Sequence, residues 1–306
     1  MSPEPCGSQL LLELFSKTST GVVYKALPLD GPPEIRLVLR FDEDFARLPE
    51  VDRTVRKHAK QWQAVRDINA LNLLETAKPG EPLWCACEYR QGRLLSDVLE
   101  RCKHEGIPLA VDQSVYLAER LAGSLLSAAT QDLSHGCMTP EWILVTFEGE
   151  VKILPGLCKD ILASHPREGT AAEVLRRYQP ALPEGARLPR NAADICAVGA
   201  LLFEFLVHEP FFTGAAGFDP AKRLEEAKKG EGSAEGLPAN LHGILRRSLL
   251  QGTPEAYADL AALKADLDQL ITSGEYSPTT FNIAFLMHSL FRGVDEAESN
   301  ADQALV

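Results

Sequence analysis

Apolar and polar positions alternate at short range through the first ninety residues. Four runs, LLLELF, TGVVYKAL, EIRLVLRF and LWCACEY, are rich in Leu, β-branched or aromatic residues and are separated by Gly, Pro and Asp. This composition favours short β-strands that end at turns. Between the last two runs, DRTVRKHAKQWQAVRDINALNLL has apolar residues at helical spacing. Residues 10–95 are therefore predicted to form a small, strand-rich lobe with one helix.

From Ser96 onward the pattern becomes helical. SDVLERCKHEG has a capping side chain at Ser96 and a stop signal at Gly106, and VDQSVYLAERLAGSLLSAATQD has the spacing of a long amphipathic helix. A short hairpin, WILVTFEGEVKIL, precedes NAADICAVGALLFEFLVHEP, which is apolar on nearly all sides and is expected to be a buried central helix. Further helical patterns lie at 238–250 and 254–272. Residues 96–273 thus predict a larger helical lobe, and the fold class is α+β with two lobes.

The last segment, 274–306, lies beyond these two lobes. YSPTTFNIAFLMHSLFRG begins with a capping Ser277 followed by Pro278 and carries a wide apolar stripe. The stripe consists of Phe281, Phe285, Leu286, Leu290 and Phe291. It either docks on the large lobe or contacts a partner protein or a second copy of the chain. The acidic residues that follow, VDEAESNADQALV, are predicted to be disordered.

The composition excludes several classes of protein. A net charge of −12 argues against a nucleic-acid partner, because the field of the whole chain would repel phosphates. The seven cysteines form no Cys-x-x-Cys pair and no grouping with His at zinc spacing, so we expect buried, reduced thiols. The beginning lacks the pattern of a secretory signal, and no apolar run reaches the roughly 20 residues of a membrane span. We expect a cytoplasmic protein without a membrane span.

Taken in order, these segments resemble the bacterial eukaryotic-type (Hanks-type) Ser/Thr protein kinases over residues 10–272. TGVVYKA resembles the second strand of the small lobe, and ACEYRQGRLLSDVL resembles the hinge and the helix after it. SHGCMTPEWILVTFEGEVKIL is similar to the catalytic loop and the metal-binding hairpin. ADICAVGALLFEFL is similar to the central helix of the large lobe, with Asp194 in its acidic position. The resemblance implies a two-lobed protein kinase-like fold.

The small lobe departs from the kinase pattern. In that family a glycine-rich loop lets the backbone approach the ATP phosphates. Here Ser16 and Thr18 stand at two of the three glycine positions, and only Gly21 remains. Arg40 occupies the position of the phosphate-binding lysine, and His58 that of its glutamate partner. The resemblance therefore implies that the usual ion pair is missing, because an Arg facing a His cannot form it.

The catalytic loop departs further. Counting from its leading His135 places Cys137 at the catalytic base, Thr139 at the lysine and Trp142 at the magnesium-binding asparagine. Pro155 stands at the second magnesium-binding position. Trp142 either fills the space of the metal or offers a stacking surface, and Cys137 beside His135 is a conceivable nucleophile. The resemblance implies a chain that is not an enzyme, with no cofactor, no metal and no Mg-ATP.

Two hypotheses of function follow from the resemblance. The first is a catalytically inactive pseudokinase that serves as a protein-interaction scaffold or allosteric regulator in bacterial signalling, with an unidentified protein partner or by self-association. The alternative is a metal-independent nucleotide-binding switch or an atypical transferase. An acidic side chain turned into the cleft, such as Glu141 or Asp160, would favour the alternative.

Overall fold

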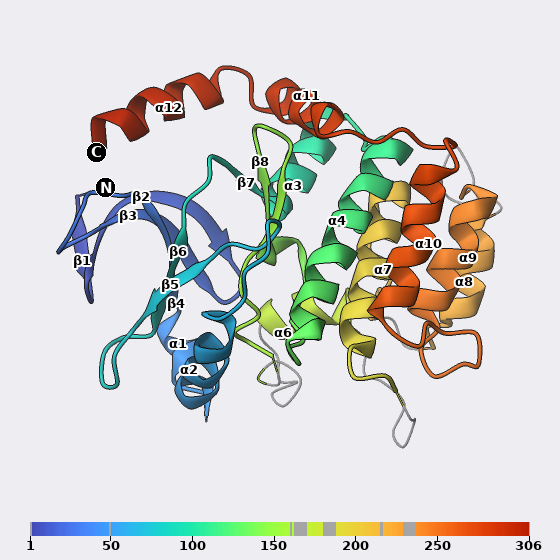
Figure 1. The fold of residues 1–306 in the computed structure, drawn as a ribbon, viewed down its shortest axis with the longest axis horizontal. Helices are drawn as coiled ribbons and strands as arrows, with labels where there is room; N and C mark the ends of the chain where they lie inside the picture. Colours follow the sequence, from blue (N-terminus) through green and yellow to red (C-terminus); the bar gives the residue numbers. More distant parts are fainter. Residues whose placement is uncertain are drawn as a thin grey trace.

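The strands of the first lobe form a single antiparallel sheet in the order β1-β2-β3-β4-β6-β5 (Figure 1). The strands are β1 (Glu4–Cys6), β2 (Gln9–Thr18), β3 (Gly21–Pro28), β4 (Arg36–Phe41), β5 (Leu73–Thr76) and β6 (Trp84–Glu88). The architecture comes from a computed structural model that describes residues 2–48, 50–159, 161, 170–179, 188–214, 217–228 and 237–305. Within them, the four predicted strand runs correspond to β2, β3, β4 and β6.

One helix covers the inner face of this sheet. The short α1 (Glu43–Ala46) leads into α2 (Val51–Trp62), which buries a stripe that includes Val55, Ala59 and Trp62. The predicted helix ends earlier than its pattern indicated. The Asp67 side chain accepts the amide of Asn69 and turns the chain, and the residues after this turn form strand β5 beside β6. Pairing with β6 thus overrides the helical spacing of these residues.

A second, smaller sheet joins the lobes. Its strands are β7 (Gly92–Leu94), β8 (Ile143–Thr146) and β9 (Val151–Ile153), in the order β7-β8-β9, and the 3-10 helix η1 (Pro140–Trp142) precedes β8. The predicted hairpin is formed by β8 and β9. Its turn requires Gly149, which has a φ of 83° and lies so close to Thr280 that a Cβ would sit 2.0 Å from the carbonyl oxygen.

The second lobe is helical and is built around a buried helix. Its helices are α3 (Leu95–Glu105), α4 (Val111–Thr130), α6 (Thr170–Arg176), α7 (Ala192–Val207), α8 (Pro220–Lys228), α9 (Ala239–Leu249) and α10 (Leu260–Thr272). Helix α7 packs against α4 and α9 and is buried along most of its length, as its apolar composition predicted. Helix α3 begins at Leu95, with Leu94 as its N-cap, so Ser96 lies inside the first turn. The predicted two-lobed α+β arrangement is confirmed.

The tail forms two helices that cross from the large lobe to the small one (Figure 1). Helix α11 (Thr280–Leu290) is capped by Thr279, one residue after the predicted Ser277–Pro278 start. The acidic residues after it form α12 (Val294–Leu305), so the predicted disorder is wrong. The acidic residues of this helix find a basic partner, because Lys25 of the small lobe contacts Glu298 and Asp302. In the part of the chain that the structure describes, no helix has both the length and the apolar composition of a membrane span.

Candidate functional site

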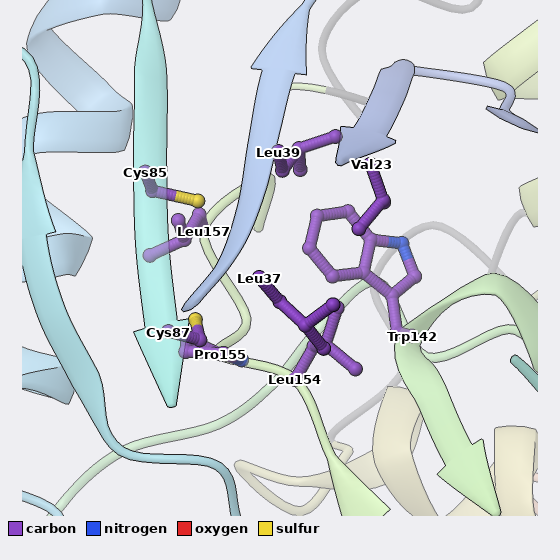
Figure 2. A pocket seen from close by; sticks show the side chains of 9 residues that line it. All are labelled: Val23, Leu37, Leu39, Cys85, Cys87, Trp142, Leu154, Pro155 and Leu157. Carbon is purple, nitrogen blue, oxygen red and sulfur yellow. The ribbon is translucent and has the colours of Figure 1, made fainter. Parts of the chain in front are cut away.

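The cleft between the lobes is filled with apolar side chains. Only about 10 Å³ of free space remains between them, roughly the volume of a single water probe, whereas sites for small molecules measure about 300–1,000 Å³. Strands of the small lobe and the segment after β9 supply the walls (Figure 2). The lining residues are Val23, Leu37, Leu39, Cys85, Cys87, Trp142, Leu154, Pro155 and Leu157. In this conformation the cleft has no room for a nucleotide.

Trp142 is the largest side chain in this filling. This residue is 4% exposed, and its indole lies beside Val23 in the filled cleft (Figure 2). Thr139 caps the 3-10 helix that carries it, and the Trp142 carbonyl accepts the amide of Leu154 at 2.8 Å. The indole also meets the ring of His135 edge-on, with centroids 5.9 Å apart. Of its two interpretations, the geometry favours the filling of space over a stacking surface.

The loop that carries His135 is held in place by the buried carboxylate of Asp194. The backbone amides of His135 and Gly136 donate to Asp194, at 3.0 and 2.7 Å. Burial lowers the pKa of His135 to about 4, so its ring is neutral at pH 7. His135 Nε2 donates to the Leu154 carbonyl at 3.0 Å, and Nδ1 lies 3.6 Å from Cys137 Sγ. Asp194 therefore fixes the loop through its backbone.

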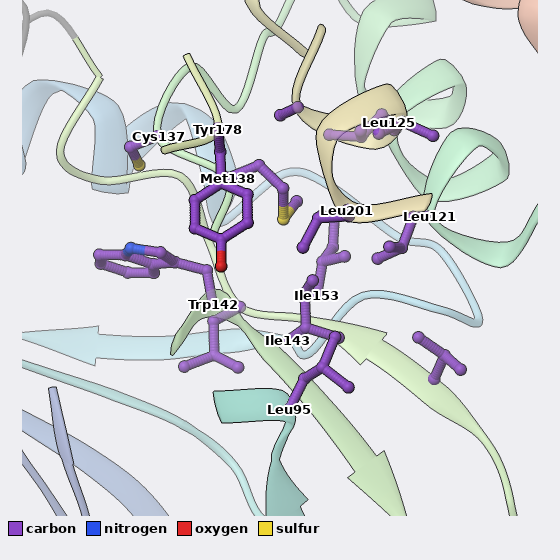
Figure 3. Packing of buried hydrophobic residues seen from close by; sticks show 14 of the residues in the cluster. Leu95, Leu121, Leu125, Cys137, Met138, Trp142, Ile143, Ile153, Tyr178 and Leu201 are labelled. Carbon is purple, nitrogen blue, oxygen red and sulfur yellow. The ribbon is translucent and has the colours of Figure 1, made fainter. Parts of the chain in front are cut away.

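Cys137 is enclosed by this arrangement. The thiol is fully buried, together with Met138, Trp142 and Tyr178 (Figure 3). Because His135 Nε2 must carry the proton that Leu154 accepts, the neutral Nδ1 acts as acceptor for the thiol. A nucleophile needs contact with its substrate, which this thiol lacks in the described conformation. The geometry favours a structural role for Cys137.

Thr139 and Pro155 have structural roles. Thr139 Oγ1 accepts the amide of Glu141 and so begins the helix η1. Pro155 lines the closed cavity, and its carbonyl accepts the amide of Leu157. No group of three or more His, Cys, Asp or Glu side chains in the described part of the chain is arranged to hold a metal ion.

Arg40 lies on the face of the sheet opposite to the predicted one. Side chains alternate along a strand, and in β4 it is Leu37 and Leu39 that face the cleft. The Arg40 guanidinium instead donates to Glu4 at 2.9 Å and to the Tyr24 hydroxyl at 3.1 Å, on the outer face. Placing Arg40 at the lysine position was therefore wrong by one residue of register, which reverses the face of a strand.

His58 does lie on the inner side of α2, as predicted, but it does not meet Arg40. Its ring is buried, and Nδ1 lies 3.3 Å from the carbonyl oxygen of Leu157. The cation that is enclosed near the hinge is Lys25, from strand β3, with 1% of its side chain exposed. Its position in the run TGVVYKAL, between apolar residues of a strand, was the available signal that it would be buried.

Glu141 is the acidic side chain that turns toward the small lobe. Its carboxylate accepts the amide of Ser19 at 2.9 Å and the Ser19 hydroxyl, and Ser16 donates to Asp97 at 3.1 Å. Burial raises the pKa of Glu141 above its usual value, and the two hydrogen bonds from Ser19 partly offset this effect. The β2–β3 loop is thereby tied to the large lobe, across the mouth of the cleft. Asp160, the other acidic candidate, lies outside the described residues.

A wide groove lies on the helical lobe, with a volume of about 640 Å³. Helices α3 and α7, the end of α6 and the loop after α3 form its walls. Apolar side chains such as Leu99, Ile107 and Val174 line it, together with the carboxylates of Glu100 and Glu204. The Tyr178 hydroxyl donates to Glu204 at 2.7 Å, and burial raises the pKa of this glutamate. Sequence reasoning missed this groove, because its walls come from distant segments.

The apolar stripe of the tail is divided between two surroundings. Leu286 and Leu290 are buried against the large lobe, and Phe291 is half-buried with its ring centroid 6.4 Å from that of Phe147. Phe281 and Phe285 are 74% and 65% exposed. The tail helix α11 thus docks in cis with one face and leaves two phenylalanines on the surface.

Comparisons with known proteins point to one family. Serine/threonine-protein kinase PknL of Mycobacterium tuberculosis is 24% identical over 261 residues, which cover 82% of this chain and 62% of PknL. PknB of the same organism is 25% identical over 233 residues, covering 73% and 37%. The chain therefore spans less than two thirds of the length of these curated relatives. The solved structure of the M. tuberculosis PknI kinase domain matches with a TM-score of 0.64 and 14% identity, over 88% of this chain and 98% of that domain.

These comparisons confirm the predicted fold and correct one prediction. No family model matches the chain. The prediction that the chain is not an enzyme is contradicted, because its relatives are named as Ser/Thr protein kinases. That prediction assigned each catalytic part to one fixed position in the sequence. Arg40 shows that such an assignment can fail by a single residue, which is enough to place a side chain on the wrong face.

Proposed function

We propose that this chain, which belongs to the bacterial Hanks-type Ser/Thr protein kinases, has a regulatory role in cytoplasmic signalling. It would act by binding a segment of another protein. One observation carries the proposal, namely the contrast between the interlobe cleft and the groove of the helical lobe. The interlobe cleft retains about 10 Å³, whereas the groove of the helical lobe offers about 640 Å³. Of these two, only the groove has room for a segment of a partner in this conformation.

The lining of the groove defines the chemistry of the partner. Leu99 and Ile107 offer apolar contact, and Glu100 is exposed at the same surface. Lys103 and Arg177 also line the groove, so its own charge is mixed, but the whole chain carries −12. A chain of this charge attracts basic segments. The proposed partner is an extended segment that presents an apolar side chain to Ile107 and an Arg or Lys to Glu100.

Peptide binding tests this role directly. The probes are two fluorescent heptapeptides with one central Leu, flanked by Arg residues in one and by Glu residues in the other, and binding is followed by anisotropy. We expect only the basic peptide to bind. Glu100→Lys should weaken the affinity for this peptide at least tenfold, which corresponds to about 1.4 kcal/mol. Glu255→Lys, a surface carboxylate that pairs with Arg246 away from the groove, serves as the matched control and should bind normally.

Three results would overturn the proposal. One is equal binding of the basic and acidic peptides, which would remove the charge argument, and another is unchanged affinity in Glu100→Lys. Transfer of phosphate from Mg-ATP to the bound peptide would assign the groove to a substrate and would replace the regulatory role by that of a kinase.

The alternative of a metal-independent nucleotide switch requires the cleft to open. Trp142 and the bonds of Ser19 to Glu141 would have to move before a nucleotide could enter. Thermal unfolding with ATP or ADP, each with and without Mg²⁺, measures this. A nucleotide at 100 times its Kd adds about 2.7 kcal/mol of stability. A shift of several degrees that ignores magnesium would make the switch the better account.

A further inference from the structure

A cluster of charged and aromatic side chains lies where helix α12 meets both lobes. Lys25 comes from strand β3 of the small lobe, Tyr89 and Gln91 from the connection between the lobes, and Arg93 from strand β7 beside the large lobe. Glu298 and Asp302 of α12 are four residues apart and therefore lie on one face of the helix. These two carboxylates face the four donors Lys25, Tyr89, Gln91 and Arg93. We call these four residues the cradle.

A single carboxylate of α12 joins the lobes. Glu298 Oε1 lies 3.3 Å from Lys25 Nζ, and Glu298 Oε2 lies 2.9 Å from an Arg93 guanidinium nitrogen. Arg93 is itself packed among the rings of Phe15, from the small lobe, and Phe147, from the hairpin of the second sheet, at 5.9 and 5.6 Å. The Glu298 side chain is therefore bound from both sides of the hinge.

Asp302 completes the contact. Its carboxylate accepts Lys25 at 2.8 Å, the Tyr89 hydroxyl at 2.6 Å and the Gln91 amide at 3.1 Å. Lys25 and Asp302 are 1% and 9% exposed, so the pair is shielded from water and is weakly screened by salt. Burial raises the pKa of Asp302, but the hydrogen bonds from Lys25, Tyr89 and Gln91 outweigh this and leave the pKa below its usual value. Asp302 is therefore charged at neutral pH.

The two tail helices are held by different forces. Helix α11 buries Ile283, Leu286, Met287 and Leu290 against the large lobe, so it stays attached through apolar contact. Helix α12 has one buried residue with a described side chain, Asp302, and its contacts to the cradle are polar. Gly293, with a φ of 72°, lies between the two helices. When α12 leaves, water can hydrate the charged groups on both sides of this contact, whereas release of α11 would expose apolar surface, so α12 can leave while α11 remains.

We infer that α12 is a releasable latch, which binds the cradle through Glu298 and Asp302 and thereby holds the two lobes closed over the filled cleft. It acts at the hinge side, while Ser19 and Glu141 close the opposite side. Release of α12 lets the lobes separate and exposes the cleft. The inference concerns lobe closure and is independent of what the groove binds.

Thiol accessibility tests the latch in the full-length protein. The described residues include seven buried free cysteines, of which Cys85 and Cys87 line the cleft and Cys196 lies in the core of the large lobe. Alkylation by iodoacetamide, mapped by peptide mass spectrometry, therefore reports cleft opening and global unfolding separately. In the double variant Glu298→Gln/Asp302→Asn we expect Cys85 and Cys87 to react at least tenfold faster, with Cys196 unchanged.

A matched control and a second variant keep the result unambiguous. Glu296→Gln makes the same kind of charge change on an exposed face of the same helix and should leave every thiol protected. Deletion of residues 294–306 should reproduce the double variant. Equal protection of Cys85 and Cys87 in wild type and deletion would overturn the latch. Simultaneous labelling of Cys196 in both altered proteins would also overturn it, because α12 would then support the whole fold.

Discussion

The interlobe cleft and the groove of the helical lobe are two hollows of opposite character. The cleft is filled by Trp142 and by aliphatic side chains of β3 and β4, and two serines of the small lobe bond across its mouth. The groove is open and carries carboxylates beside apolar walls. The difference teaches that side-chain packing, here Trp142 among aliphatic and thiol side chains, decides whether a hollow between elements stays open.

The strongest way to break this contrast is to empty the cleft. Trp142→Ala should destabilise the protein by about 3–5 kcal/mol, because a buried aromatic side chain is lost and its cavity cannot collapse fully. Urea unfolding measures the change, and Trp142→Phe, which retains most of the volume, should cost less than half as much. A loss below about 1 kcal/mol would show that the indole is not part of the packing.

Cutting the bonds across the mouth should have a smaller effect. Ser19→Ala removes the hydroxyl bond to Glu141 and leaves the backbone bond in place, so we expect a loss of about 0.5–1.5 kcal/mol. Amide exchange in β3 should also become faster, because the loop at its start is released. Ser273→Ala, on an exposed hydroxyl of the large lobe, is the control. Unchanged amide exchange in β3 would show that the bond from the Ser19 hydroxyl to Glu141 does not help to hold the lobes closed.

The carboxylates provide a test by pH. The pKa of Glu141 is raised in the folded state, so its ionisation opposes folding: stability from this group is present below its unfolded pKa and is lost as the pH rises through the folded pKa. Glu141→Gln keeps an acceptor for Ser19 and removes the ionisation. As the pH rises from about 4.3, the usual pKa of a glutamate, to about 7, the variant should lose less stability than wild type. Parallel curves would contradict the buried carboxylate.

The smallest effect is expected on the tail surface. Phe281→Ser/Phe285→Ser should change the free energy of unfolding by less than about 0.5 kcal/mol, since both rings are exposed. If these rings are the partner contact that the sequence suggested, the double variant should be more monomeric than wild type by light scattering at high protein concentration. Identical mass at every concentration would remove self-association through α11.

The sequence predicted those parts of the fold whose apolar pattern is decided locally. Helix α7 is buried on all sides, as its composition required, and the β8–β9 hairpin turns at the predicted glycine. Arg40 was misplaced because a shift of one residue along a strand moves a side chain to the opposite face of the sheet. No local sequence pattern fixes this register. Helix α12 was missed because its partners, Lys25 and Arg93, are some 200 to 280 residues away in the chain. The groove was missed for the same reason.

Hydrogen exchange with each ligand compares the two hollows in one experiment. The full chain is measured alone, with the basic heptapeptide and with Mg-ATP. The account predicts that the peptide slows exchange in α3 and α6, at the groove, and that Mg-ATP leaves β3, β4 and β6 unchanged because the cleft is already filled. Slower exchange in those strands with Mg-ATP, and no effect of the peptide on α3 or α6, would contradict it.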